Sequence, residues 1–560
     1  MYIKVTKSAG HSYIQLAESY RDDNGKPRQR VLSTIGRADE SGGQVDSILN
    51  ALLRAKGRTA DEPQIEFESA LSLGDVWALH RLWQEVGFDE LSRVFRKARY
   101  TTAVEHAIRV MVFNRLCDPD SKLGVLRWLK TVSIPEVDAT TLTHQQLLRS
   151  MDALMDHQEA VDEVVARQLR PMVDQDLSLV FYDLTTIGVE GHSEQSDDVR
   201  HYGMSKEGLI ARQFMLGVVQ TAEGLPIYHE VFDGNQAEAP TLLPTLKKVI
   251  ARFPHIRRLI IVADRGLLSL DNMEALQEIK LDDGRMLEFI LAVPARRYGD
   301  FLEILTQFQA KITDQEQETI DETLWQDKRL VIAHHPVRAK EQTEWRKAKI
   351  KDLEDKANKW AGKLDEQDTG TKYRGRKLSD SGAKARFYHE VKEAHLAKII
   401  KVDMKSDLFT YQIDENALKQ AELLDGKLLL VTNVTDLTPQ EVVTRYKGLA
   451  DIERGFKVLK SEIEIAPVYH RLPQRIRAHA MICFMALILY RIMRTRLKMA
   501  NTGLSPERAL AQLKAIHRHQ VKVNDKPVSG VSTLTKEQTD LLGTLTLRKP
   551  TKKEQLSLDL

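Results

Sequence analysis

Cysteine is scarce in this chain of 560 residues. Its two cysteines, Cys117 and Cys483, lie far apart and form no CxxC pair, which argues against a disulfide framework and against a cysteine zinc site. The N-terminal stretch "MYIKVTKSAG" lacks the apolar core of a signal peptide. The longest apolar run, "AMICFMALILY" (480–490), is too short to span a bilayer. We therefore expect a soluble, non-secreted protein in which this run is a buried helix.

A large excess of charge of either sign is also missing, since the net charge is +2 with 29% charged residues. The length exceeds that of a single hydrophobic core, so we expect two to four domains. Locally the charge is uneven: residues 92–130 carry nine Lys or Arg against three Asp or Glu. This block is either a solvated helix face or a surface that contacts the DNA backbone.

Strand and helix signals divide the chain into segments. Residues 11–36 alternate around "DDNGK", which predicts a hairpin with an Asn-Gly turn, and residues 72–170 have a helical pattern throughout. Residues 176–296 predict the order βββαβαβ, which is an α/β core with a mixed sheet.

Residues 297–437 interrupt this core. They hold the charged helical stretch "EWRKAKIKDLEDKANKWAGKL", a basic stretch at 371–386 that we expect to be a flexible loop, and two strands. Thr438, Pro439 and Glu441 then form the N-cap, first position and capping box of a new helix.

Two aspartates follow short apolar strands. Asp183 comes after "LSLVFY", and Asp264 comes after "RRLIIVA". Carboxylates at the carboxyl ends of strands face the ligand crevice of α/β folds. Taken singly, each aspartate could equally be a turn or cap residue.

A third carboxylate, Glu453, stands on the apolar stripe of the predicted helix 445–462. Its burial without a partner would cost several kcal/mol, so something must neutralise it. An ion pair with Lys457 would do so. Alternatively, Glu453 meets Asp183 and Asp264 around Mg²⁺ or Mn²⁺, which prefer hard oxygen ligands. Two such ions would activate a nucleophilic oxygen and stabilise the leaving oxygen of a phosphodiester.

Six stretches in this order resemble the DDE transposases of bacterial insertion sequences, in particular the group with a tyrosine–arginine–glutamate–lysine signature and its insertion sequence 1634 branch. The stretches are "FYDLTTIGVE", "HYGMSKEGL", "LPIYHEVFDGNQAEAPTLLPTL", "LIIVADRGLLSLDNMEAL", "DGKLLLVTNV" and "YKGLADIERGFKVLKSEIEIAPVYH". The resemblance implies an RNase H-like core in which Asp183, Asp264 and Glu453 bind two catalytic Mg²⁺ or Mn²⁺ ions.

The same resemblance assigns DNA phosphate contacts to Tyr446 and Lys460, which stand seven residues before and after Glu453. We predict that all three share one face of a single helix. The signature arginine position is occupied by Leu449, which makes no charged phosphate contact; Arg445 or Arg454 are candidates to replace it.

The expected fold class is an α/β multidomain protein. It has an RNase H-like mixed-sheet core interrupted by a β-rich insertion, and a mostly helical N-terminal DNA-binding region. The expected domains are a hairpin region (1–60), a helical DNA-binding region (61–172), the first part of the core (173–296), the insertion (297–437), the catalytic helix and the helix after it (438–500), and a C-terminal region and tail (501–560).

Further candidate DNA contacts are basic or imidazole side chains near these motifs. Each also has a simpler interpretation as a solvated turn, an ion pair or a structural residue. The candidates are Lys206, Arg265, Arg454, Lys457 and His470.

The last residues, "QLSLDL" (555–560), resemble the short peptide with which bacterial proteins dock on the DNA polymerase sliding clamp. Gln555, Leu556 and Leu558 would fill the groove, because alternate side chains of an extended peptide point the same way. A disordered tail without function is the alternative.

These observations predict a transposase of the bacterial cytoplasm, associated with the nucleoid. It would bind terminal inverted repeats and cleave and transfer strands with Mg²⁺; the resemblance to the family implies that it acts as a homodimer. The alternatives are a non-catalytic DNA-binding descendant and an RNase H-like nuclease that only hydrolyses DNA.

Overall fold

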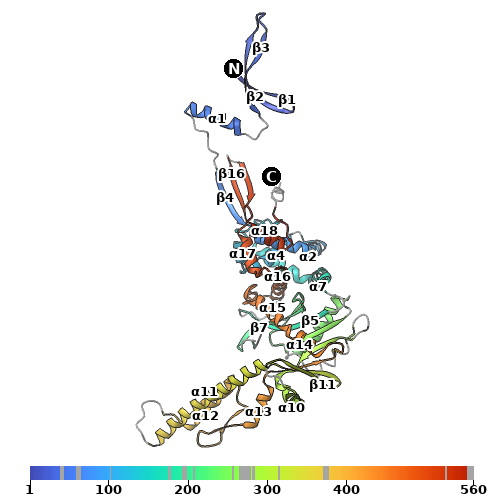
Figure 1. Ribbon diagram of the computed structural model, residues 1–560, viewed down its shortest axis with the longest axis vertical. Helices are drawn as coiled ribbons and strands as arrows, with labels where there is room; N and C mark the ends of the chain where they lie inside the picture. The colour runs from blue at the N-terminus through green and yellow to red at the C-terminus, as the bar shows by residue number, and fades with distance from the viewer. Residues whose placement is uncertain are drawn as a thin grey trace. The chain divides into compact units, whose positions relative to one another are not determined.

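The computed structural model divides the chain into two compact units. One unit contains residues 1–70 and 518–532, and the other contains residues 71–517 and 533–550 (Figure 1). The structure describes the whole chain except residues 38–42, 58–64, 101, 174–177, 192–197, 206–207, 255, 257, 264–275, 277–278, 281–283, 285, 313–315, 370–376, 524–525 and 551–560.

The N-terminal unit begins with a three-stranded antiparallel sheet of β1 (Tyr2–Ser8), β2 (His11–Arg21) and β3 (Pro27–Arg37). The predicted hairpin is confirmed: β2 and β3 are joined through Asn24 and Gly25, and Gly25 has the positive φ of 73° that the turn requires. Helix α1 (Gly43–Ala55) and a second sheet of β4 (Ile65–Ser72), β16 (His517–Val523) and β17 (Lys526–Val531) follow. The expected mostly helical N-terminal region is wrong for these residues, because strands predominate in them.

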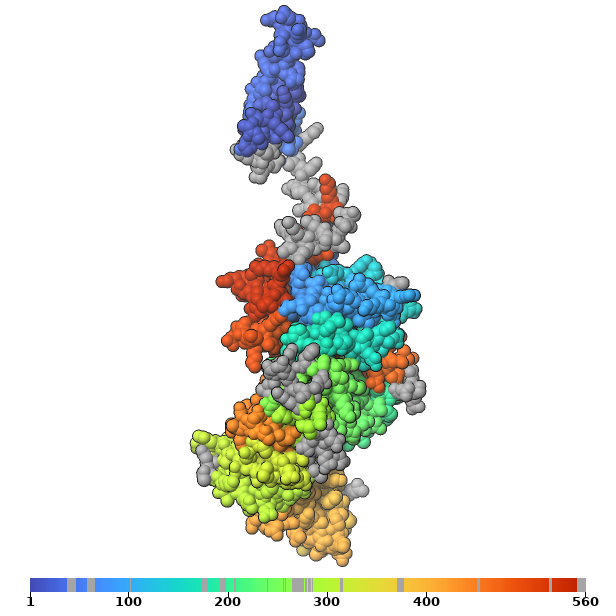
Figure 2. Space-filling view, turned by 90° about the vertical axis from the view of Figure 1, so that its right-hand side faces the viewer, coloured from blue at the N-terminus to red at the C-terminus, as the bar shows by residue number. Residues whose placement is uncertain are grey.

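The larger unit begins with a group of helices that starts at residue 74, and we call this group the helical block. It contains α2 (Gly74–Val86), α3 (Leu91–Lys97), α4 (Val104–Cys117), α5 (Lys122–Trp128), α6 (His144–Asp156) and α7 (Gln158–Leu169). Three later helices pack with it: α16 (Pro473–Met499), α17 (Pro506–Lys514) and α18 (Lys536–Thr544). Figure 2 shows the red C-terminal helices against the blue helices of the block.

Helix α16 contains the long apolar run of the sequence. By length and composition it passes the test for a membrane-crossing helix, but nearly all of its apolar stretch is buried inside the protein. It contacts α4, α6 and β8, as the core helix that the sequence predicted.

A nine-stranded mixed sheet forms the centre of the larger unit. Its order is β11-β12-β15-β10-β9-β5-β7-β6, and β8 also pairs with β7. The only parallel pairs among its described strands are β5 with β9 and β9 with β10. The strands are β5 (Ser178–Gly188), β6 (His201–Met204), β7 (Ile210–Thr221), β8 (Pro226–Asp233), β9 (Leu259–Ala263), β10 (Glu288–Ala292), β11 (Thr319–Trp325), β12 (Lys328–His334) and β15 (Lys427–Thr432).

The predicted strand order is confirmed for β5, β7, β8, β9 and β10, with α8 (Leu242–Arg252) between β8 and β9. The short edge strand β6 is an addition that the sequence did not reveal. The helix expected at 269–280 lies largely outside the described residues.

The insertion is helical rather than β-rich, so that prediction is wrong. Its strands β11, β12 and β15 belong to the central sheet, whereas α11 (Pro336–Asp368) and α12 (Asp380–Glu393) lie side by side as an arm (Figure 1). The arm has its own core, which includes Leu353, Phe387 and Val391. Its remaining elements are α10 (Leu302–Gln309), β13 (Ile400–Val402), β14 (Tyr411–Ile413) and α13 (Glu415–Leu424).

The basic stretch 371–386 is therefore not all loop. Residues 371–376 lie outside the described part, but α12 begins at Asp380, where the Ser379 side chain caps it by accepting the Gly382 N–H.

The basic block at 92–130 is divided between interior and surface. Arg109, Arg115 and Lys122 are buried, and Arg109 contacts His80 and Glu136 inside the helical block. These three cannot lie on a DNA-binding surface. The other six are exposed: Arg93, Arg96, Lys97, Arg99, Arg127 and Lys130.

Candidate functional site

The first two candidate ligands come directly after the last parallel pair of two neighbouring strands; Asp183 lies within β5, which continues to Gly188 in its pairing with β7, and does not follow the strand as the sequence suggested. β5 and β9 run parallel, and their last paired residues are Tyr182 and Ala263. Asp183 comes next after Tyr182, and its half-buried carboxylate accepts the backbone N–H of Leu184 at 2.7 Å. Asp264, the next residue after Ala263, and its neighbour Arg265 lie outside the described residues.

The two faces of β5 are covered by different helices. The Tyr182 hydroxyl donates to Thr241, at the start of α8, at 2.8 Å. Phe181 points to the other face, where its ring lies against Gly448 at the junction of two helices. Side chains alternate along a strand, so Asp183 shares the face of Phe181. The second of those helices, α15 (Leu449–Ser461), contacts β5 on this face.

The predicted catalytic helix consists of two helices. α14 (Pro439–Lys447) has the expected capping box between Thr438 and Glu441, so that prediction is confirmed. A turn at Gly448 then separates α14 from α15. The prediction that Tyr446, Glu453 and Lys460 share one continuous helix is therefore wrong, because Tyr446 belongs to α14 and the other two belong to α15.

Glycines allow α15 to approach the sheet closely. A Cβ on Gly448 would come within 3.0 Å of the Arg445 carbonyl oxygen and 3.1 Å of the Phe181 ring. One on Gly455 would come within 2.7 Å of the Gln220 Nε2 and 2.9 Å of the Arg491 Nη2. Glu453 lies between these two glycines in the sequence; its helical backbone is described, but its side chain is not.

Gln220 is a residue of this region that the sequence did not single out. It is fully buried opposite Phe181 on β7, and neither polar atom of its amide has a hydrogen-bond partner among the described residues. Nothing in its local sequence, "GVVQTAEG", indicates a polar side chain beneath α15; only the long-range packing of Gly455 reveals it.

The candidate DNA contacts differ in exposure. Arg454 and Lys457 are exposed on α15, while Lys460 and Tyr446 are half-buried. Lys206 and the tail residues Gln555, Leu556 and Leu558 lie outside the described residues. The last turn of α14 and the middle and last turn of α15 thus carry a mixture of solvent-facing cations and partly packed side chains.

His470 lies among cations. Burial, and after it the nearby positive charges of Lys122, Arg475 and Arg115, lower its pKa to about 3. Burial likewise lowers the pKa of Lys122 to about 7. His470 is therefore neutral at neutral pH, so it has a hydrogen bond but no charge to offer a phosphate.

Among residues with described side chains, no three His, Cys, Asp or Glu converge in the manner of a metal site. Two of the three predicted ligands are outside that set, so the predicted metal site stays a prediction.

Comparison with protein families gives two matches. A model described as the transposase DDE domain matches residues 174–489, and one described as the IS1634 family transposase N-terminal domain matches residues 3–64. A search of curated proteins found no match. The DDE match covers more than half of the chain and includes β5, β9 and α15. The chain therefore belongs to the DDE transposases, within the IS1634 family, and is an enzyme that cuts and transfers DNA.

Proposed function

We propose that this transposase binds the terminal inverted repeats of an insertion sequence, cleaves the element's ends and joins them to target DNA, using Asp183, Asp264 and Glu453 as ligands of two Mg²⁺ or Mn²⁺ ions. One relationship carries the proposal: α15, the helix of Glu453, covers the sheet face to which Asp183 points. In addition, the residues that precede the two aspartates, Tyr182 and Ala263, are paired neighbours.

The donor chemistry supports a divalent cation. DDE transposases generally use divalent metal ions. Asp183 is not fully buried, and its carboxylate accepts the Leu184 N–H; a carboxylate can accept several bonds through its two oxygens. A cation bound there would supply Lewis-acid stabilisation of a phosphodiester oxygen. The chain itself would supply the fixed carboxylates, and α15 would exclude bulk water from one side of the sheet.

The DNA near the scissile bond would be held by residues of α14 and α15. Exposed Arg454 and Lys457 are suited to phosphates, and Tyr446 and Lys460 flank Glu453 in the sequence. Lys206 and Arg265 complete the proposed set. His470 is a weaker candidate than its position in the sequence suggested, because its ring is neutral.

Exposed cations of the helical block, Arg93, Arg96, Lys97, Arg99, Arg127 and Lys130, would add sequence-independent affinity for the terminal repeats. We further propose a homodimer in which each core acts on one DNA end, in the cytoplasm and associated with the nucleoid. The six-residue tail would dock on the sliding clamp.

A strand-transfer assay tests the main proposal. The full-length protein is incubated with labelled terminal-repeat DNA, target plasmid and Mg²⁺, and both cut and joined products are measured. Joined products support the proposal. Binding without cutting indicates a non-catalytic descendant, and cutting without joining indicates a nuclease; either result contradicts it.

The tail is tested separately. A peptide of residues 549–560 should bind purified sliding clamp, and replacing Leu556 and Leu558 by Ala should abolish binding. Absence of binding at high micromolar peptide would remove the clamp from the proposal.

A further inference from the structure

The three-stranded sheet at the N-terminus has two chemically different faces. The pairing of β1 with β2 and of β2 with β3, including its two register shifts, assigns each side chain to a face. One face, here called the cationic face, carries no acidic residue from these three strands. Its polar members are Tyr2, Lys4, Thr6, Ser8, His11, Tyr13, Gln15, Ser19, Arg21, Gln29, Thr34 and Arg37.

The opposite face, here called the aliphatic face, combines four aliphatic side chains with three basic ones, Lys7, Arg28 and Arg30. Ile3 and Val5 of β1 lie beside Ile14 and Leu16 of β2. Ile3 and Val5 are 65% and 61% exposed. The one acidic residue of the sheet strands, Glu18, is on this face and is neutralised there by an ion pair with Arg30. The cationic face therefore has no acidic side chain from these strands.

A chain of side-chain hydrogen bonds crosses the cationic face. The Thr6 hydroxyl donates to the Gln15 Oε1 at 2.8 Å, and the Gln15 Nε2 donates to the Thr34 hydroxyl at 3.3 Å. These bonds fix the amide plane of Gln15 in the middle of the sheet. A primary amide has two acceptor sites and two N–H groups, so these two bonds use only one of each.

These features match the major groove of DNA. Strands about 4.8 Å apart give three strands a width of about 10 Å, and the major groove is about 12 Å wide and admits β-ribbons. A glutamine amide pairs with adenine in two bonds, accepting from N6–H and donating to N7. Lysine and arginine at the rim of the face would neutralise the phosphates on either side.

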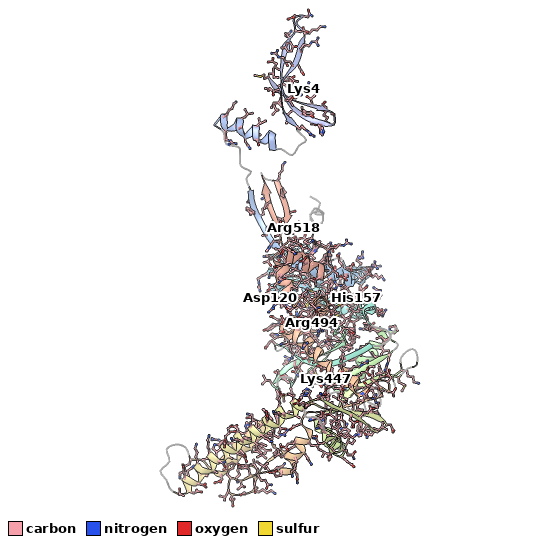
Figure 3. The ribbon with its side chains drawn as sticks, in the orientation of Figure 1. Lys4, Asp120, His157, Lys447, Arg494 and Arg518 are labelled. Carbon is pink, nitrogen blue, oxygen red and sulfur yellow. The ribbon has the colours of Figure 1, made fainter. Side chains whose placement is uncertain are left out.

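We propose that the cationic face of β1–β3 is the sequence-reading surface of this transposase, which enters the major groove of duplex DNA with Gln15 on a base edge and with Lys4 and Arg21 on phosphates. This inference rests on the proposed binding of terminal repeats. It assigns the reading of sequence to strands of the N-terminal unit rather than to the helical block. Figure 3 labels Lys4 on β1.

Two lysines of β1 provide a matched pair of variants. Lys4 is on the cationic face, whereas Lys7, three residues later on the same strand, is on the aliphatic face. Lys4→Ala and Lys7→Ala remove the same charge from opposite faces of one strand. Because both side chains are on a surface strand, thermal melting should show both variants folded like the wild type.

The measurement is the affinity of the full-length protein for short labelled duplexes that tile the DNA flanking its gene, and for scrambled duplexes, over a range of salt concentrations. We expect Lys4→Ala to weaken binding to every duplex and to reduce the slope of log K against log salt by about one. We expect Lys7→Ala to change neither quantity. Gln15→Ala should weaken binding to the preferred duplex roughly five- to 150-fold and leave scrambled duplexes unaffected.

The outcomes separate this inference from the proposed function. If the wild type prefers a flanking duplex but Lys4→Ala and Gln15→Ala bind it unchanged, the assignment to the cationic face is overturned and terminal-repeat binding stands. Equal losses for Lys4→Ala and Lys7→Ala also overturn it. If Lys4→Ala changes the mass of the assembly in solution relative to the wild type but leaves DNA affinity unchanged, the face is a contact between copies of the chain. That result would contradict the inference. A wild type that binds no flanking duplex refutes both proposals.

Discussion

Tyr182 and Ala263 lie side by side in the central sheet, on parallel strands. Each immediately precedes an aspartate, Asp183 or Asp264, and the two form the last pair of the parallel ladder between β5 and β9. Parallel strands present their carboxyl ends at the same edge. The backbone pairing of these two strands therefore supports the proximity of the two aspartates without reference to any side chain.

Because α15 lies close to β7, we expect that a single methyl group added at Gly455 will lower the stability of the protein. Gly455→Ala would place a Cβ within 2.7 Å of the buried Gln220 amide, so either the helix or the amide must move. We expect a loss of about 1–3 kcal/mol in the free energy of unfolding, together with reduced strand cleavage because α15 carries Glu453. Denaturant titration and the cleavage assay measure the two effects.

Gly362 is the matched control for this substitution. It lies in α11 with no heavy atom within 4 Å of the position of an added Cβ. Gly362→Ala should therefore stabilise the protein by about 0.5–1 kcal/mol through helix propensity and leave cleavage unchanged. Similar behaviour of the two variants would contradict the tight packing at Gly455.

The buried ammonium group of Lys122 should make the stability of the protein depend on pH. Burial lowers its pKa from 10.5 to about 7, so between pH 7 and 10.5 the unfolded chain binds a proton that the folded chain does not. Through this residue, the free energy of unfolding rises with pH across that window. At and below pH 7 the buried charge is destabilising, and Lys122→Met should raise the melting temperature.

The gain from Lys122→Met should shrink as pH increases from 7 towards 10.5, which melting curves at several pH values can measure. Lys130→Met, at an exposed lysine of the same block, should show little change at any pH. A gain from Lys122→Met that did not depend on pH would show that the side chain is not an unpaired buried cation.

Arg258 joins the central sheet to the segment that leads into α14. Its guanidinium bonds Glu288 at the start of β10 at 3.1 Å and Asp436 at 2.6 and 2.8 Å. A lysine cannot reproduce this forked geometry. Arg258→Lys should therefore lower the free energy of unfolding by about 1–3 kcal/mol.

The control is Arg93→Lys, at an arginine whose side chain is exposed and pairs with Glu90 three residues before it, which should cost less than about 1 kcal/mol. Urea titrations compare the two substitutions. Equal costs would mean that Arg258 has no special part in holding the sheet.

Local signals in the sequence predicted much of the fold. The Asn24–Gly25 turn, the Thr438 capping box and the apolar strands before Asp183 and Asp264 depend on neighbouring residues, and the structure has the turn, the capping box and both strands. The helix α12 also had such a signal, since Ala383, Phe387 and Val391 are spaced by four and are fully buried; the glycine and serine before them concealed it.

Features that depend on distant packing were not predictable in this way. The turn at Gly448 occurs where the helix meets the ring of Phe181, more than 260 residues earlier in the sequence. The burial of Arg109, Arg115 and Lys122 depends on which faces of α4 and α5 turn inward. Pairing of β12 with β15, which joins part of the insertion to the core sheet, likewise has no local cause.

The most direct test of the carboxylate site is a crystal structure of the protein bound to terminal-repeat DNA and Mn²⁺, with manganese located by its anomalous scattering. We expect manganese within bonding distance of carboxylate oxygens of Asp183, Asp264 and Glu453 together. Manganese elsewhere, or a Glu453 side chain directed away from both aspartates, would contradict the proposed catalytic site.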